Sequence, residues 1–471
     1  MKIVKRILVI LLVLIVYEVV GMLVPFAKMK SISEMYRKEV DINRFYAEED
    51  SQTSQRACVV ETNQEALSFR LDLFERAKES IILSTFDIRP GKSTDDLFAA
   101  LYAAADRGVQ VQILVDGMYG LLHMTGEDIF LAAGIHPNIE IRFYNIPNLL
   151  MPWTIHGRMH DKYILVDQEY LLMGGRNTFD YFIGDYTRSK GYDREVFVMS
   201  DAGEEDSAVQ QVSRYFQNMW ENEACRTVYD TRPAWKKEKL KKEVSRLLTH
   251  YNDMEQKGQL EELSYQELTV AIEKATLLTN PTHIFGKEPY IFEELRQLML
   301  SAEERVMIHT PYIVCSEEMY RGLTEVAEAV PDSRMIVNSI EAGDNVCASS
   351  DYLRHRDEVL ETGFRLYEYM GDHSTHGKSL LVDDDISVIG SYNFDNRSTY
   401  VDTETMLVID SRELNEELYQ KLKALKEQSL EVDAKGNYIE TTDVVPKEMD
   451  LEKKSVIRFL SVLIQGVRYL I

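Results

Sequence analysis

One set of residue types occurs twice in this chain of 471 residues with the same spacing. Counted from His160, a Lys, an Asp, a Gly and an Asn lie 2, 7, 14 and 17 positions further on, and the same types lie at the same distances from His376. The copies comprise His160, Lys162, Asp167, Gly174 and Asn177, and His376, Lys378, Asp383, Gly390 and Asn393. One His-x-Lys-x4-Asp motif arises by chance in roughly one chain in twenty of this size. Matching offsets in both copies therefore indicate a duplicated fold.

The apolar pattern around the two motifs also repeats. Helices are predicted at 66–77, 95–107, 292–301 and 317–328, and strands at 81–86, 109–116, 306–312 and 334–339. Strands separated by helices of this length indicate βαβ units and a sheet with parallel strands. The sequence therefore predicts an α/β protein built from two similar halves.

The motifs indicate a chemistry as well as a fold. Each leads into a predicted strand, 163–166 or 379–382, and residues two apart on a strand share a face. Each half would present an imidazole and an ammonium together, and two facing halves would surround one anionic centre. A phosphodiester suits that inventory, because Lys and Asn donors can bind its oxygens. Two histidines with an ordinary pKa of about 6.5 can divide nucleophilic attack and proton donation between them. No metal or nucleotide is required.

The paired motifs resemble the phospholipase D superfamily over about residues 57–409. Further matches to its bacterial cardiolipin synthase branch are the segments 158–162, 174–177 and 390–398, with Asn338, Ser339, Asp344, Tyr352 and Arg356. The resemblance implies two fused, pseudo-symmetric α/β/α domains with the active site at their interface. It also implies a covalent phosphohistidine intermediate, with the first His usually the nucleophile and the second the general acid and base.

The resemblance further implies an acidic residue roughly thirty positions after each His that orients the imidazole, and Asp193 and Glu404 lie at those places. The expected catalytic residues are His160, Lys162, Asn177, Asp193, His376, Lys378, Asn393 and Glu404. The motif aspartates Asp167 and Asp383 are expected to be structural. No cofactor and no metal ligand set is expected.

Residues 1–30 predict a membrane anchor. Basic residues precede the segment 7–26, which is nearly all apolar, and twenty helical residues span the hydrocarbon of a bilayer. A cleaved signal peptide is the alternative, but its apolar region is shorter and ends at a small-x-small site that this run lacks. Glu18 weakens the interpretation, because a carboxylate in a spanning helix is unfavourable. Basic residues flank both ends, so the side of the membrane on which the remaining domain lies stays open.

The rest of the chain divides around the motifs. A first half is predicted at 57–225, a charged helical connector at 226–280 and a second half at 281–430. A late helix is expected at 413–428 and a loop at 434–446. Residues 446–471 predict an amphipathic helix, with a narrow polar stripe formed by Arg458, Ser461, Gln465 and Arg468. This helix either packs on the fold or lies on lipid as an interfacial helix.

Net charge and cysteine spacing argue against nucleic-acid binding and against two kinds of cysteine site. The net charge of −25 disfavours a general nucleic-acid binder, which normally carries a basic face. The four cysteines have no C-x-x-C spacing, so a zinc cluster or a thioredoxin-like site is not expected.

These observations predict a phosphatidyltransferase held in the cell membrane by a single N-terminal anchor. It would join two phosphatidylglycerol molecules, or one with another phospholipid, into cardiolipin. The first alternative is a phospholipase D that uses water as the acceptor and releases phosphatidic acid. An endonuclease of the same superfamily and an inactive membrane scaffold are less favoured. Phospholipids and the membrane are the expected partners, nucleic acid is not, and the oligomeric state is open.

Overall fold

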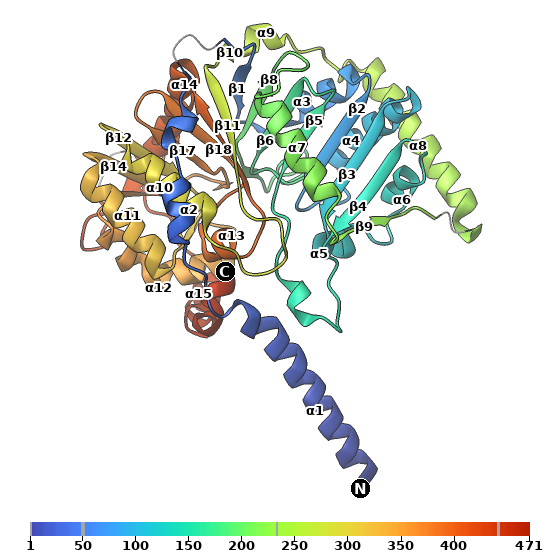
Figure 1. The fold of residues 1–471 in the computed structure, drawn as a ribbon. Coiled ribbons are helices and arrows are strands. Elements are labelled where there is room, and N and C mark those ends of the chain that lie inside the picture. The colour runs from blue at the N-terminus through green and yellow to red at the C-terminus, as the bar shows by residue number, and fades with distance from the viewer. Residues whose placement is uncertain (1, 49–51, 232–233, 440–442) are drawn as a thin grey trace.

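The computed structural model describes residues 2–48, 52–231, 234–439 and 443–471. Three predicted segments include residues outside these ranges: Met1 of the anchor, 232–233 of the connector and 440–442 of the late loop. Within the described residues, two large mixed sheets lie next to each other, one mainly from each half of the chain (Figure 1).

The two sheets have the same plan. From edge to edge the first consists of β10 (Val270–Ala271), β1 (Arg56–Val60), β8 (Glu195–Met199), β6 (Tyr170–Gly174), β5 (Tyr163–Val166), β2 (Ser80–Thr85), β3 (Gln110–Asp116), β4 (Ile139–Tyr144) and β9 (Cys225–Val228). The second consists of β11 (Lys274–Thr279), β20 (Thr405–Asp410), β18 (Ile386–Gly390), β17 (Ser379–Val382), β12 (Arg305–His309), β14 (Asp332–Asn338), β15 (Arg365–Tyr369) and β21 (Ser429–Glu431). The series from β1 to β9 matches the series from β11 to β21 strand by strand, which confirms the predicted two-half α/β fold.

Strand directions match as well. Strands β2, β3 and β4 run parallel, and so do β12, β14 and β15. The remaining neighbours in both sheets are antiparallel. Within these two sheets, parallel pairing is limited to the βαβ units. The motif hairpins β5–β6 and β17–β18 are antiparallel, because their short turns allow no other direction.

Helices pack against both faces of the sheets. In the first half they are α3 (Asn63–Arg76), α4 (Lys92–Asp106), α5 (Gly117–Tyr119), α6 (Asp128–Gly134) and α7 (Ala208–Trp220), with the π-turn η3 (Gly120–Met124). In the second half they are α10 (Tyr290–Leu300), α11 (Glu317–Ala329), α12 (Val346–Glu361), α13 (Asn396–Tyr400) and α14 (Arg412–Glu427). Helix α3 begins before the predicted residue 66, because Thr62 and Glu65 form a capping box. Strand β12 ends at His309, before the predicted residue 312, since Pro311 follows closely.

A shared apolar core joins the halves. It contains side chains from the first sheet such as Leu171 and Val196, and from the second such as Leu381 and Leu407, each with no exposed surface. Helices α7 and α14 contribute Phe216 and Leu418 to the same core. The sheets therefore pack against each other through apolar surface, and their relative position is fixed by burial.

The predicted connector at 226–280 is only partly helical. Its helices are α8 (Lys237–Gln256) and the short α9 (Tyr265–Leu268). Its first residues complete β9, and its last form β11, the edge strand of the second sheet. The second half therefore begins before residue 281, because the short apolar run of β11 lies directly beside a highly charged stretch that favoured a helical interpretation.

The N-terminal helix α1 (Lys2–Leu23), extended by the turn η1 (Val24–Phe26), projects from the globular part (Figure 1). It is long and apolar enough to cross a membrane. Its mean hydropathy is 3.0, and none of the residues in its apolar stretch is buried. The next elements, α2 (Glu34–Glu39) and η2 (Ile42–Phe45), pack on the second half. There the Tyr36 ring stacks on Tyr290 at 3.8 Å, and Phe45 is fully buried.

The C-terminal helix differs from its predicted bounds, and it contacts the fold. Helix α15 begins at Leu451 rather than 446, and it continues as the 3-10 turn η6 (Ile464–Leu470). Part of the polar stripe faces α12: the Arg468 Nε donates to Asp351 at 2.9 Å, and Gln465 contacts His355 at 2.9 Å. Ile457 and Ile464 are buried on the same segment, whereas Phe459 and Val462 are exposed. The segment therefore packs on the fold through both apolar and polar residues and still leaves apolar side chains outward.

The motif aspartates lie in the turns of the two motif hairpins. Asp167 accepts hydrogen bonds from the backbone N–H groups of residues 78, 79 and 80, at 2.7, 2.8 and 2.8 Å. Asp383 accepts from those of residues 303, 304 and 305, at 2.9, 2.9 and 3.0 Å. Both have a left-handed backbone, with φ of 53° and 49°. We propose that they hold the start of β2 and β12 to the hairpins and take no part in catalysis.

The Asp383→Ala variant should lose about 2 kcal/mol of unfolding free energy, because three N–H groups lose a charged acceptor and Ala disfavours positive φ. Urea unfolding measures the loss. Asp383→Asn keeps one carbonyl oxygen and tolerates positive φ, so its loss should be smaller. Turnover per folded molecule should stay near the unsubstituted value in both variants. Lost turnover with unchanged stability would contradict the structural role.

Candidate active site

Two short parallel bridges cross from one half to the other beside the motif histidines. Strand β16 (Ser374–Thr375) pairs with β7 (Gly191–Tyr192), and Met159 bridges Thr403 in the same sense. On one side of each bridge the next residue is a motif histidine, and on the other side it is an acid. The bridges therefore place the acid of each half beside the histidine of the other half.

The histidine–acid contacts follow this crossed pattern. The Nδ1 of His160 lies 2.8 Å from Glu404 Oε1, and the Nδ1 of His376 lies 2.5 Å from Asp193 Oδ2. Both acids are fully buried, whereas the imidazoles are 12% and 13% exposed. An orienting acid was expected roughly thirty residues after each histidine, and the structure pairs each acid with the histidine of the opposite half. Because each Nδ1 is engaged by an acid, Nε2 is the nitrogen left for a substrate, and on His376 it lies 3.1 Å from Lys378 Nζ.

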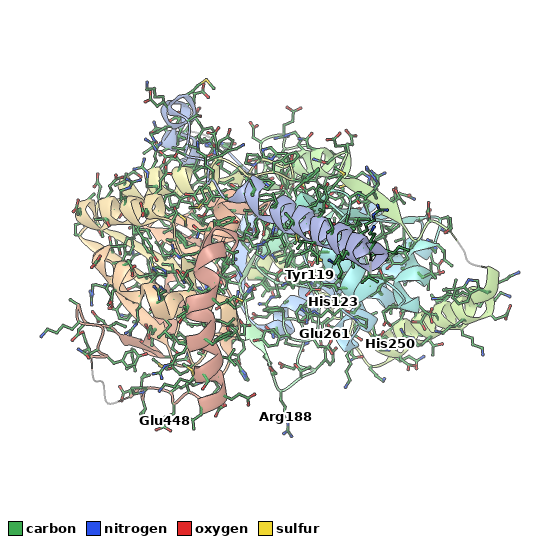
Figure 2. All side chains as sticks on the ribbon, turned by 90° about the horizontal axis from the view of Figure 1, so that it is seen from below. Tyr119, His123, Arg188, His250, Glu261 and Glu448 are labelled. Carbon is green, nitrogen blue, oxygen red and sulfur yellow. The ribbon has the colours of Figure 1, made fainter. Side chains whose placement is uncertain are left out.

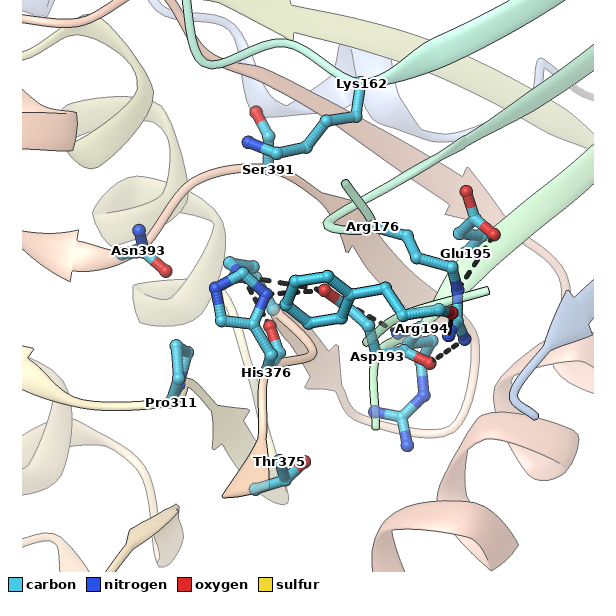
Figure 3. Close-up of polar contacts among 12 residues, drawn as sticks. Lys162, Arg176, Asp193, Arg194, Glu195, Pro311, Thr375, His376, Ser391 and Asn393 are labelled. Carbon is cyan, nitrogen blue, oxygen red and sulfur yellow. Dashed lines mark hydrogen bonds and ion pairs between the residues drawn. The ribbon is translucent and has the colours of Figure 1, made fainter. Parts of the chain in front are cut away.

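The motif lysines are buried behind the imidazoles. The Nζ of Lys162 donates to the carbonyl of His160 at 2.5 Å and lies 5.1 Å from the centre of the Phe86 ring. The Nζ of Lys378 lies 2.7 Å from His376 Nδ1. Figure 3 shows His376 between Asn393 on one side and Asp193 on the other, with Lys162 from the first half above them. Two cationic groups from different halves therefore converge there.

Both motif asparagines are buried and incompletely bonded. Among the residues that the structure describes, the Oδ1 atoms of Asn177 and Asn393 have no hydrogen-bond partner. The Nδ2 of Asn393 donates to the hydroxyl of Tyr312 at 3.3 Å. Buried amides normally find partners, and the assignment of O and N in such a group is interchangeable. The two free amide ends are therefore available to a ligand.

The two histidine–acid pairs differ in their electrostatics. Burial raises the pKa of Glu404 well above its usual range, and Lys162 opposes this only in part. Burial also acts to raise the pKa of Asp193, but Lys378 and His376 outweigh it, so that this pKa is lowered. Asp193 is consequently the more strongly ionised acid of the two.

The pKa values of the two imidazoles also differ. Burial, with Lys162 and Lys378, holds the pKa of His160 well below its ordinary value. Burial and Lys378 also lower the pKa of His376, but the Asp193 carboxylate opposes them. Burial lowers the pKa of Lys162 to about 7. Of the two imidazoles, His160 is therefore held neutral more strongly, while His376 has an anion beside it that stabilises a proton.

One pair of equivalent positions also differs between the two sites. Ser391 follows Gly390 in the second motif, and its hydroxyl donates to Glu404 at 2.5 Å. The equivalent residue of the first motif is Gly175, where an added Cβ would lie only 2.5 Å from Asp193 Oδ1. The longer Glu404 is thus held by a hydroxyl, whereas the shorter Asp193 approaches the backbone directly.

Sequence reasoning missed Arg194, which ties the halves together beneath His376. Its guanidinium pairs with Glu61 at 2.6 Å and donates to Ser379 Oγ at 2.8 Å. It also lies 3.2 Å from His309 Nδ1, and the Nε2 of His309 contacts the Thr375 hydroxyl at 3.0 Å. The only available signal was its place directly after Asp193, at the start of an apolar strand.

Arg176, which belongs to the matched segment 174–177, supports the same region. It pairs with the buried carboxylate of Glu195 at 3.1 Å and donates to the backbone carbonyl of Asp193. Arg70 pairs with Glu195 from the other side at 2.6 Å. Arg176 therefore fixes the segment that carries Asp193 and does not point at the histidines (Figure 3). In the described part of the chain, no group of three or more His, Cys, Asp or Glu residues is placed to hold a metal ion.

Comparison with known families agrees with this geometry. The family described as "Cardiolipin synthase, PLD-like domain" matches residues 71–220 and 295–426, one segment in each half. The chain belongs to this family. It is therefore an enzyme of the phospholipase D superfamily, a phosphatidyltransferase or phosphodiesterase, and the resemblance seen in the paired motifs is confirmed.

The individual proteins similar to this chain are distant in sequence. Cardiolipin synthase C of Escherichia coli is 27% identical over 395 residues, which cover 75% of this chain and 81% of that protein. An uncharacterized protein of Helicobacter pylori is 25% identical over 429 residues, covering 82% and 83% of the two chains. The crystal structure of phosphatidylserine synthase from Haemophilus influenzae aligns with a TM-score of 0.62 at 15% identity, over 88% of this chain and 95% of that one. This last likeness shows a shared fold.

Removing the Asp193 charge should impair His376 as a proton carrier. Asp193→Asn should lower kcat by about 10³-fold or more, by the logic of an acid that orients a catalytic imidazole. It should also move the basic limb of the kcat/KM profile to lower pH, because the pKa of His376 falls when its anionic partner is lost. Asp372→Asn is the matched control, since the Asp372 side chain is 98% exposed. An unchanged pH profile in Asp193→Asn would contradict the assigned interaction.

Proposed function

We propose that this enzyme is a membrane-bound phosphatidyltransferase that makes cardiolipin from phosphatidylglycerol, alone or with a second phospholipid. The observation that carries the proposal is the convergence of two complete His–Lys–Asn sets, each with an acid from the opposite half. The family match and the similarity to cardiolipin synthase C of Escherichia coli support phosphatidyl transfer. These similarities support a phospholipid phosphatidyltransferase. The arrangement of the site supports the proposed mechanism.

His160 is the nucleophile in this mechanism. Its Nδ1 is engaged by Glu404, and burial with two nearby lysines keeps the ring neutral, so Nε2 carries a free electron pair. His376 is the general acid, because the ionised Asp193 beside its Nδ1 stabilises an imidazolium. This division uses the asymmetry between the two pairs.

In the first step, His160 Nε2 attacks the phosphorus of one phosphatidylglycerol. The bond from phosphorus to the glycerol oxygen breaks, and His376 gives its proton to that oxygen. Glycerol leaves, and a phosphatidyl group stays bound to His160. In the second step, His376 takes the proton from a hydroxyl of a second phosphatidylglycerol. The resulting oxygen attacks phosphorus, the bond to His160 breaks, and its electron pair returns to Nε2. One phosphodiester replaces another, so no activated donor is needed.

The lysines and asparagines stabilise the phosphoryl oxygens in both steps. Buried ammonium groups are poorly solvated, which is why burial lowers the pKa of Lys162 and Lys378. A phosphodiester anion between them restores their preference for the charged form. The unpaired amide ends of Asn177 and Asn393 offer further polar contacts from each half. Charges that are already in place stabilise the transition state most strongly in a buried site, where water is excluded.

The main alternative is hydrolysis, in which water resolves the phosphohistidine and phosphatidic acid is the product. Phosphatidyl transfer predominates over hydrolysis only if the site holds a lipid hydroxyl at high effective concentration and limits the access of water. Attachment through α1 favours this outcome, because donor and acceptor then reach the site from one bilayer. We place the enzyme in the cell membrane on that basis, and no side of the membrane is assigned to the active domain.

The products distinguish transfer from hydrolysis. The purified full-length enzyme, reconstituted in phosphatidylglycerol vesicles, should release glycerol and accumulate cardiolipin, as measured by lipid mass spectrometry. Vesicles with enzyme carrying both His160→Ala and His376→Ala provide the background. Phosphatidic acid as the main product at every phosphatidylglycerol density would move the assignment to phospholipase D.

The two histidines should behave differently when each is removed. His160→Ala and His376→Ala should both reduce turnover by several orders of magnitude, because each ring has a step that the other does not perform. His376→Ala retains the nucleophile, so a short incubation with lipid should leave a phosphatidyl adduct on the peptide that contains His160. His160→Ala should carry no adduct. An adduct on His376 in the latter variant would reverse the assigned roles.

A further inference from the structure

Three segments with exposed apolar side chains lie toward the end of the molecule from which α1 projects, where α15 and α5 are labelled in Figure 1. They come from three segments that are distant in sequence. Their members are Val456, Phe459, Val462 and Leu463 on α15, residues 149–151 before the turn η4 (Pro152–Ile155), and Leu121 and Leu122 on the π-turn η3. We call these three segments together the apolar end face.

Helix α15 is apolar on its outer side as well as on its buried side. Its buried side includes Ile457 at 1% and Ser461 at 8% exposure, and Gln465 and Arg468 of η6 contact α12. Phe459 and Val462 on the outer side are 68% and 67% exposed. A helix on a water-facing surface normally places polar residues on its outer side. These exposed apolar side chains indicate that something apolar covers the outer side of α15.

The loop at 149–151 lies directly against α1. The hydroxyl of Tyr17 donates to the carbonyl of Leu150 at 2.8 Å. Gly21 allows the close approach of Pro152, since an added Cβ would lie 2.3 Å from its Cγ. Leu149 and Leu150 are each 81% exposed beside this contact. Tyr17 lies inside the apolar stretch, roughly 13 Å along the helix axis from Phe26.

The position of the loop on α1 identifies what covers the face. If α1 crosses a bilayer, a loop that reaches Tyr17 is already at or below the lipid surface, because the hydrocarbon core is about 30 Å thick. The turn η6, which continues α15, is tied to the end of α1 nearer the globular part, since the hydroxyl of Tyr469 donates to the carbonyl of Leu23 at 3.1 Å. Figure 2 views this end and shows α1 and α15 both toward the viewer.

We propose that the apolar end face docks on the bilayer as a second membrane contact beside α1, so that the globular part sits on the lipid surface. The inference goes beyond the proposed reaction and does not depend on it. A bilayer fits better than a second copy of the chain, because the covering material must also surround α1 at the level of Leu150.

Docking in this orientation also brings the lipid surface close to the active site. Tyr119 and His123 lie on the same side as α1 in Figure 2, and their rings are 5.8 Å apart. The Tyr119 ring packs on Phe86 at 4.2 Å, and Phe86 packs on His160 at 4.8 Å. On the other half, η6 is joined to α13, where the N–H of Arg397 donates to the carbonyl of Ile471 at 3.2 Å. The apolar end face is therefore only a few side chains away from the motif residues of both halves.

Spin labels on the full-length chain test the proposal. The background variant is Cys347→Ser, because Cys347 is the exposed cysteine and the other three are buried. Labels are attached to Leu150→Cys, Phe459→Cys and the control Leu268→Cys. Leu268 is 47% exposed on α9, at the opposite end from α1 (Figure 1). The proteins are reconstituted in phosphatidylcholine vesicles, which contain no phosphatidylglycerol, so the readout is independent of the proposed reaction.

Collision rates with oxygen and with a water-soluble nickel chelate report the surroundings of each label. At Leu150 and Phe459 the ratio of oxygen to nickel collisions should be several-fold higher than at Leu268, because oxygen concentrates in lipid and the chelate is excluded. Equal ratios at the three sites would overturn the proposal. Strong dipolar broadening between Phe459 labels, with a low oxygen rate, would place a second copy on the face and would overturn it as well.

Discussion

Everything in the candidate site depends on the exchange of acids between the two halves. A histidine works as a nucleophile or proton carrier only when its ring is oriented, and here the orienting groups Glu404 and Asp193 come from the opposite half. Two short bridges, at Met159–Thr403 and at β16–β7, set the registers that make this possible. Those registers hold only because the sheets pack through a common apolar core and Arg194 links Glu61 to Ser379 across the interface.

The buried charges of the site make sense only in relation to a ligand. Lysines and imidazoles lose solvation when they are buried, and two ammonium groups close to two imidazoles repel added protons. A protein selected for stability alone would replace such a cluster with apolar groups. The arrangement instead keeps cationic donors and unpaired amides ready for an anion, which is the pattern expected where local rules are broken for function. The unequal ionisation of Asp193 and Glu404 then gives two similar imidazoles different tasks.

Much of this organisation could be read from the sequence. The offsets from His160 and His376 predicted two equivalent halves, and the equivalent strand orders confirm the duplication. The crossed pairing could not be read, because distance along a chain does not tell which half's loop reaches a given ring. Strand β11 could not be recognised, because its short apolar run follows a highly charged stretch. The side of the C-terminal segment that faces the fold depends on a contact with Asp351, a residue more than a hundred positions away. Arg194 was missed because its partners Glu61 and Ser379 come from opposite halves.

The exchange of acids also bears on how such a chain can arise. The acid of each half contacts the histidine of the other half, so one half alone would hold a histidine without an orienting acid. Two copies of a single half meeting about a two-fold axis would satisfy both histidines in the same way. The chain therefore has the arrangement of a homodimer, with α8 (Lys237–Gln256) in the segment that joins its two halves. Within a single chain the two halves can differ, and the contrast between Gly175 and Ser391 is a difference that a symmetric dimer of identical halves could not have.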